Sequence, residues 1–175
     1  LRRIDRSTLS RENQVDAAAL DNELRYAIWT EQQFRDWSWD PLVYTRLAGQ
    51  ALYGLLARDF APLPDRLRSL TARLEELPRL LEQERANLVP ERVPAIHAET
   101  ALKQNPGVLS LVDELAVPGM GSLPEADRAR LKSAIETARA AVQSHQQWLE
   151  TELVPKARGD FRIGRDLYDQ KLGFA

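Results

Sequence analysis

Cysteine is absent from this 175-residue sequence, and histidine occurs only twice, as His97 and His145. Without cysteine the chain has no disulfide, no thiolate metal site and no cysteine nucleophile. No apolar run approaches the roughly 20 residues that a membrane-spanning helix needs. A net charge of -2 provides no field that would recruit nucleic acid or an anionic membrane. A folded domain remains the expected class, since 43% of the residues are hydrophobic and 29% are charged.

The sequence does contain sustained helical periodicity, and no segment alternates as a strand would. We therefore predict an all-α fold, an irregular bundle of about five to seven helices in a single domain over residues 1–175. Ser10 marks one helix start and Asp40 with Pro41 marks another, because these residues suit a cap and a first turn. Ser122 and Glu125 match a capping box that starts a long helix, which we expect to end before Pro155. Shorter helices are expected over residues 95–104 and 108–116, and residues 118–121 are expected to form a flexible loop.

The third helix has the clearest pattern. Its leucines recur at alternating steps of three and four, the spacing of a heptad seam; they are Leu67, Leu70, Leu74, Leu77 and Leu81. We interpret the stripe as packing within a bundle and not as a dimer zipper, because the run is too short for a sustained coiled coil. Pro78 interrupts it and predicts a kink or a short break in the helix.

The sequence contains no pattern of residues typical of a catalytic or metal-binding site. His97 and Glu99 are two residues apart, so on a helix they point to different faces and cannot chelate one ion. The sequence has no His-Glu-x-x-His pair, no nucleophile elbow and no phosphate-binding glycine loop. We interpret His97 as a polar or partly buried side chain near a helix start, and His145 as an exposed or packing side chain. The residues themselves thus identify no catalytic residue and no metal ligand.

Two aromatic or irregular stretches remain as candidate ligand contacts. Trp37 and Trp39 could line a groove, although the simpler interpretation is that their indoles close a gap between helices. Residues 158–164 interleave glycine, charge and an aromatic ring. They could form a tight turn between helices, with glycines at positive φ, or present Asp160 or Arg162 to a substrate cleft.

Several short motifs occur together in one order over almost the whole chain. They are Trp39-Asp40-Pro41-Leu42-Val43-Tyr44, Arg58-Asp59-Phe60-Ala61-Pro62-Leu63, Arg73-Leu74 with Leu77-Pro78, Ala86-Asn87-Leu88, Glu99-Thr100-Ala101, Trp148-Leu149, and Gly159-Asp160-Phe161-Arg162-Ile163-Gly164 with Tyr168 and Leu172. This progression resembles the bacterial family known as domain of unknown function 885. Each motif is weak alone, and their shared order makes the match specific.

The resemblance implies a part of a larger enzyme. Members of that family are long helical proteins that resemble gluzincin-type zinc metallopeptidases, and many resemble exported or lipid-anchored proteins. Their zinc motif, His-Glu-x-x-Pro-Gly-His, follows the glycine-aspartate-phenylalanine element, and it does not occur in this sequence. The resemblance therefore implies zinc in the intact protein, no cofactor in this chain, and an extracytoplasmic location. No catalytic residue can be transferred by position.

Our leading hypothesis is an N-terminal helical segment that forms one wall of a substrate cleft and is inactive alone. The implied partners are the missing C-terminal half or a peptide substrate, and the oligomeric state is left open. The candidate cleft contacts are Asp160, Arg162, Tyr168, Trp37 and Trp39. The alternative is a self-contained helical module whose groove binds a peptide or a partner helix. An active enzyme of unknown mechanism is the least favoured of the three hypotheses.

Overall fold

The structure is a computed structural model that describes residues 3–110 and 112–174. The chain divides into two compact units, one of Trp37–Asp160 and the other of Leu1–Asp36 with Phe161–Ala175. Within the described ranges the fold is all-α, as predicted, and its only extended pairing is an isolated bridge between Pro94 and Gly159. None of the described helices has the length and apolar character to cross a bilayer.

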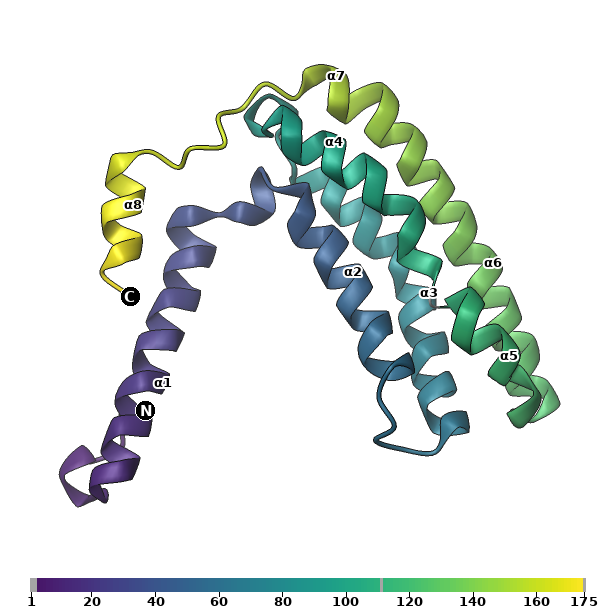
Figure 1. Ribbon diagram of the computed structural model, residues 1–175, viewed down its shortest axis with the longest axis horizontal. Coiled ribbons are helices and arrows are strands. Elements are labelled where there is room, and N and C mark those ends of the chain that lie inside the picture. The colour runs from purple at the N-terminus through teal and green to yellow at the C-terminus, as the bar shows by residue number, and fades with distance from the viewer. Residues whose placement is uncertain (1–2, 111, 175) are drawn as a thin grey trace. The chain divides into compact units, whose positions relative to one another are not determined.

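The larger unit, Trp37–Asp160, is a helical bundle in which α3 and α6 lie side by side over most of their lengths (Figure 1). The α2 helix also packs along α3, and the short α4 helix packs against α2. Helix α6 continues through a π-helical turn, Leu149–Leu153, into one last turn, α7. The bounds are α2 Pro41–Leu56, α3 Leu63–Asn87, α4 Ala95–Gln104, α5 Val117–Gly119, α6 Glu125–Trp148 and α7 Val154–Lys156.

Local sequence signals explain where α2 and α3 lie. The Asp40 side chain accepts a hydrogen bond from the Leu42 amide at 3.0 Å, and Pro41 occupies the first turn of α2. The predicted leucine stripe of α3, from Leu67 to Leu81, is buried inside this unit, where α3 meets α2 and α6. The interpretation as internal packing is confirmed.

A second cluster of buried side chains fills the end of the bundle where α2 and α4 begin. Its members come from α2, the segment between α3 and α4, α4, and the turn after α6. They are Tyr44, Leu88, Val93, Ala98, Ala101, Leu149 and Leu153, with Trp37 packed against them. This cluster fixes the chain segments that carry the site described below.

The structure differs from the sequence expectations at several places along the chain. Helix α3 is continuous through Pro78, so the predicted short break is absent, while the alternative, a kink, stays a prediction. Leucines before and after the proline are anchored in the core. Ser122 does not cap α6; its hydroxyl donates to the Gly119 carbonyl, and α6 starts after Pro124. The helix also continues past Pro155 to Lys156, since proline is tolerated in the first turn of the new segment. Residues 118–121 are helical turns and not a loop, with Gly119 packed on Leu63.

The smaller unit contains α1 (Arg11–Trp29), which Ser10 caps as predicted, and α8 (Arg165–Leu172). Helix α1 is joined to α8 by a hydrogen bond from Trp29 Nε1 to Gln170 Oε1, and to the segment after α8 by one from Asn22 Nδ2 to the Phe174 carbonyl, both 2.8 Å. Trp29 stacks with Tyr26 and Phe34, and the ring of Phe174 packs against Tyr26 and Trp29 at a tilt.

Helix α1 has a second apolar stripe on the side opposite these bonds. Leu20, Leu24 and Ile28 recur every four residues, so they lie on one face of α1, and each is about half exposed. The smaller unit thus has little buried core of its own, and α1 has an exposed hydrophobic face.

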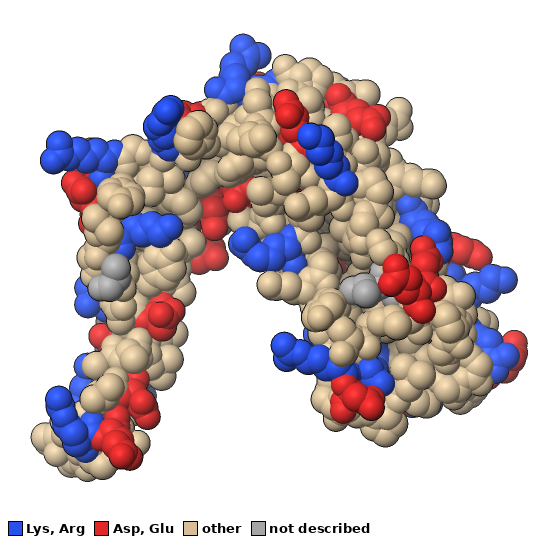
Figure 2. All heavy atoms as spheres, in the orientation of Figure 1, with Lys and Arg blue, Asp and Glu red and all other residues tan. Residues whose placement is uncertain are grey.

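Figure 2 shows lysine, arginine, aspartate and glutamate side chains interspersed on the surface in view, in keeping with the net charge of -2.

Candidate functional site

The amino ends of α2 and α4 bring together a carboxylate and an imidazole. Asp40 Oδ1 lies 3.1 Å from Nδ1 of His97, and the two side chains are 17% and 24% exposed. The ring of Trp39 lies beside the imidazole, with centroids 6.1 Å apart and planes inclined by 31°. We call these three residues the Asp40–His97 site. Nδ1 of His97 is hydrogen-bonded to Asp40, while no described residue is hydrogen-bonded to Nε2.

Gly159 fixes the chain that leads into α4. Its amide donates to the Val93 carbonyl at 2.9 Å, which forms the isolated bridge with Pro94. A Cβ atom at Gly159 would lie 2.0 Å from the carbonyl oxygen of Arg92, so no other residue fits this approach. The requirement is for close backbone contact and not for positive φ, whereas Gly164 does have φ of 80°. Asp160 therefore starts from a fixed position beside the entrance to α4.

The five residues predicted as cleft contacts separate between the two units. Trp37, Trp39 and Asp160 belong to the larger unit, where Trp37 packs on the second core cluster and Trp39 on His97. Arg162 and Tyr168 belong to the smaller unit. A cleft role for the five stays a prediction.

Within the smaller unit, the guanidinium of Arg162 lies over the ring of Phe161 at 4.7 Å. Tyr168 is about half exposed and lines a pocket of about 340 Å³ with side chains of α1 and the C-terminal segment, including Tyr26 and Phe174. The pocket walls are mainly aromatic and aliphatic, with Glu23 and Lys171 as the charged groups.

Sequence reasoning did not find the Asp40–His97 pair. The sequence indicates Asp40 as a helix cap and as part of a family motif, and the one carboxylate it suggests as a partner of His97 is the near neighbour Glu99. The two partners are 57 positions apart, and no spacing rule links a helix cap to the third residue of another helix. The available signal was that each of them stands at a predicted helix start.

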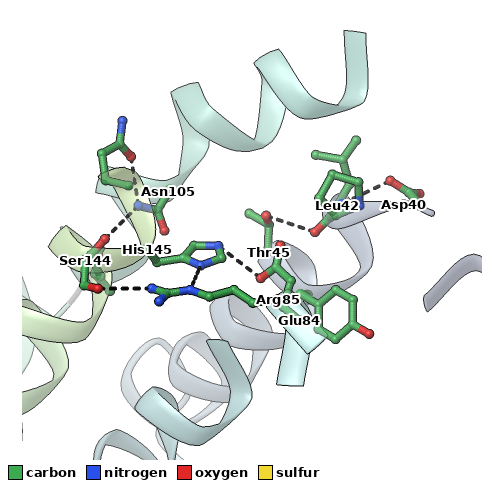
Figure 3. A network of polar contacts seen from close by, with 12 residues as sticks. Asp40, Leu42, Thr45, Glu84, Arg85, Asn105, Ser144 and His145 are labelled. Atoms are coloured by element: carbon green, nitrogen blue, oxygen red, sulfur yellow. Dashed lines mark hydrogen bonds and ion pairs between the residues drawn. The ribbon is translucent and has the colours of Figure 1, made fainter. Parts of the chain in front are cut away.

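A second polar cluster is buried between α3 and α6. Nε2 of His145 lies 3.2 Å from Glu84 Oε2, and both side chains are almost fully buried. The guanidinium of Arg85 donates to His145 Nδ1 at 3.4 Å and to the Ser144 hydroxyl at 3.3 Å. Figure 3 shows His145 between Arg85 and Glu84. Trp148 stacks on the imidazole, with ring centroids 5.4 Å apart.

Electrostatics at this cluster are set mainly by burial. Desolvation raises the pKa of the Glu84 carboxyl above its ordinary value, against the opposing effects of the His145 bond and the Arg85 charge. Oxygen Oε1 of Glu84 is buried and has no hydrogen-bond partner. Because both nitrogens of His145 are engaged and the ring is closed off, we assign this cluster a structural role. Of the two interpretations of His145, exposed or packing, the structure supports the second, since the side chain is 3% exposed.

Metal ligation does not fit the described residues. In residues 3–110 and 112–174, no three side chains of histidine, cysteine, aspartate or glutamate are grouped so that they could hold a metal ion. His97 has one acidic partner and no second ligand nearby. The zinc implied by the resemblance therefore has no site among these residues, and no step through zinc is derived for them.

The fold and the site together define an all-α helical bundle that carries a partly exposed aspartate–histidine pair. The chain belongs to the family of bacterial proteins of unknown function called DUF885, whose profile matches residues 1–175. It is similar to the solved structure of a candidate lipoprotein of unknown function from Shewanella oneidensis, with 31% sequence identity and a TM-score of 0.87. That match covers 99% of this chain and 32% of the other, so the chain spans about a third of its relative's length. No curated protein matches the sequence.

Proposed function

We propose that this chain is the helical wall of a substrate cleft in a larger zinc-dependent peptidase, and that it is inactive alone. One observation carries the proposal: 99% of this chain matches a relative, while the match covers only 32% of the relative's chain. A zinc site in the remaining part of the parent polypeptide fits the lack of a ligand cluster in the described residues. Trp39 and His97, at the end of the bundle in the larger unit, are the side chains that we propose to contact a substrate.

The uncovered stripe of α1 supports the same proposal. Leu20, Leu24 and Ile28 expose about half of their surface each. Three large aliphatic side chains on one helix face favour burial against another element. The rest of the parent polypeptide is the occupant we propose, because about two thirds of the relative's chain lies outside the matched region. The relative's description as a candidate lipoprotein supports an extracytoplasmic location for the parent.

The test compares the longer parent protein with the 175-residue chain. Both are purified without metal chelators, their zinc content is measured by mass spectrometry, and peptide hydrolysis is followed with quenched fluorescent peptides. We expect stoichiometric zinc and hydrolysis in the parent, and neither in this chain. A parent that binds zinc but cleaves no peptide in a broad substrate panel would contradict the peptidase assignment. Zinc bound by this chain with His97 as a ligand would contradict the proposal that the zinc site lies in the remaining part of the parent polypeptide.

A second function, a self-contained binding module, is favoured by a groove between α2 and α3. It has a volume of about 250 Å³ and is lined mostly by small or aliphatic side chains, among them Ala48, Ala51, Leu52 and Leu77. Small residues allow close approach of a partner helix. The test measures binding of a labelled leucine-rich amphipathic peptide to this chain. Saturable binding that Ala51→Glu abolishes would favour a self-contained binding module over the wall of a substrate cleft.

A further inference from the structure

We propose that Asp40 and His97 form a proton-accepting pair, in which Asp40 holds the hydrogen on Nδ1 and His97 Nε2 accepts an N–H or O–H group of a bound peptide. The peptide as ligand rests on the proposed function, whereas the state of the pair does not. Asp40 is a positioning residue, since it acts through His97. His97 is the residue that contacts the ligand.

The hydrogen-bond pattern decides which nitrogen carries the hydrogen. Asp40 Oδ1 is 3.0 Å from the Leu42 amide and 3.1 Å from His97 Nδ1. An ionised carboxylate accepts hydrogen bonds and cannot donate them, so the neutral imidazole must carry its hydrogen on Nδ1. The lone pair is then on Nε2, the nitrogen without a described partner. This arrangement, with a carboxylate behind the imidazole, is the one that orients histidine bases in enzymes.

The fold holds this pair in place before any ligand arrives. Asp40 is fixed because it caps α2 with the same oxygen that receives the imidazole. His97 is fixed because the segment before α4 is anchored: Val93 is fully buried, Pro94 is nearly so, and the Gly159 amide bonds to Val93. Trp39 restricts the ring from the side. Orientation supplied by the folded state lowers the entropic cost of binding and of proton transfer.

His145 provides an internal comparison in the same chain. Both of its nitrogens have partners, Arg85 at Nδ1 and Glu84 at Nε2, and its side chain is 3% exposed. His97 has one nitrogen engaged and is eight times as exposed, at 24%. Both histidines pair with a carboxylate. They differ because both ring nitrogens of His145 have partners, whereas Nε2 of His97 has no described partner and can accept a hydrogen bond from a ligand. Asp40 is the charged group that faces His97 in the described contacts.

The first experiment determines the tautomer of His97 by long-range ¹H–¹⁵N NMR on the 175-residue chain. We expect the Nδ1–H form in the wild type and in Asp40→Asn, whose amide oxygen also accepts the bond. Asp40→Ser keeps a residue that caps helices well but is too short to reach the ring. It is expected to convert His97 mostly to the Nε2–H form. An Nε2–H tautomer in the wild type would overturn the proposal.

The second experiment measures the reactivity of each histidine with diethyl pyrocarbonate by mass spectrometry. The imidazole lone pair attacks a carbonyl carbon of the reagent, the bond to the ethyl carbonate leaving group breaks, and the acylated ring loses its N–H proton. Ethyl carbonate takes up a proton and decomposes to ethanol and carbon dioxide. We expect His97 to react at least an order of magnitude faster than His145. Slower reaction of His97 than of His145 would show that Nε2 is closed to ligands and would contradict the inference.

The third experiment separates this inference from the proposed function, using the longer parent protein. His97→Asn retains an N–H donor for Asp40 but has no acceptor in place of Nε2, so it preserves the structural contact. We expect peptide hydrolysis to fall about tenfold in kcat/KM with unchanged zinc content and unchanged thermal stability. Full activity of His97→Asn would refute the contact with substrate and leave the peptidase assignment intact. A parent without hydrolysis would refute that assignment, while the first two experiments still decide the state of the pair.

Discussion

Gly159 shows how one residue without a side chain can position a site. The amide of Gly159 is bonded to Val93, and its Cα lies so close to Arg92 that a methyl group would overlap the Arg92 carbonyl. The contact fixes the segment that leads into His97. The chemistry of the Asp40–His97 pair therefore depends on a residue 62 positions after the histidine that does not touch it.

Gly159→Ala is expected to destabilise the fold by about 1–3 kcal/mol or more, because overpacking against backbone cannot be relieved by a rotamer change. Gly54→Ala is the matched control. Gly54 lies inside α2 with open space around its Cα, so alanine should stabilise the helix by about 0.5–1 kcal/mol. Urea unfolding of both variants measures the two free energies. Equal effects of the two substitutions would show that the close approach is not required.

Glu84 determines a pH dependence of stability. Its folded-state pKa is raised by burial, so the folded state binds the proton more tightly than the unfolded state. The resulting stabilisation is present at pH values below the unfolded-state pKa and is lost as pH rises through the folded-state pKa. The wild type should therefore lose stability relative to Glu84→Gln as the pH rises from below the ordinary glutamate pKa to neutrality.

Chemical unfolding across this pH range tests the effect of Glu84. The control is Glu82→Gln, which alters an exposed carboxylate on the same helix and should leave the pH slope of the wild type unchanged. The same slope in Glu84→Gln and in the wild type would show that Glu84 does not titrate differently in the folded state.

At the level of elements, helix α3 carries a proline that the fold tolerates. Pro78 has no amide hydrogen to donate to the carbonyl of Leu74, yet the helix is continuous from Leu63 to Asn87. Leu74, Leu77 and Leu81, on either side of the proline, are anchored in the core. The packing of these leucines outweighs the local penalty of the proline.

Pro78→Ala is expected to stabilise the protein by about 1–3 kcal/mol, since it restores a hydrogen bond in the helix interior and removes the ring. Pro64→Ala is the control in the same helix. Pro64 lies in the first turn, where no amide donor is needed, so its replacement should have little effect. Thermal unfolding of the two variants gives the comparison. A loss of stability in Pro78→Ala would mean that the helix is shaped around the proline.

The helices that sequence periodicity predicted best are those with strong local signals. Asp40 with Pro41 fixed the start of α2, and the leucines of α3 fixed its buried face. The predicted ends near Ser122 and Pro155 were wrong: the Ser122 hydroxyl bonds to the Gly119 carbonyl and does not cap α6, and Pro155 lies in a first turn that tolerates proline. The Asp40–His97 pair was missed for a related reason, since it forms by tertiary contact between two helix starts. Local patterns thus predict elements, and long-range contacts create the candidate site.

On the scale of the whole molecule, the two units differ in how much core they contain. The larger unit buries two clusters of side chains, one around α3 and α6 and the other at the end of the bundle where α2 and α4 begin. Among the described residues of α1, only Ala17 and Trp29 are buried, and α8 has no buried residue. The helical periodicity of the sequence does not indicate this division. The apolar stripe of α1 has the same spacing as the stripe of a helix that packs on a core, so the sequence alone does not show that it is exposed.

The amides of α1 and α8 are therefore expected to exchange with solvent at a lower free energy of opening than those of α3 and α6. Native-state hydrogen exchange measured by mass spectrometry gives both values in one sample. Trp29→Ala removes the indole bonded to Gln170, so it should weaken protection in α8 and leave α6 unchanged. Leu74→Ala should do the reverse, at a cost of about 2–5 kcal/mol in the larger unit, because it empties a fully buried site. Equal protection of all four helices would show that the two units unfold together. In the longer parent, slower exchange confined to α1 would indicate that its stripe of Leu20, Leu24 and Ile28 is covered by the rest of the polypeptide.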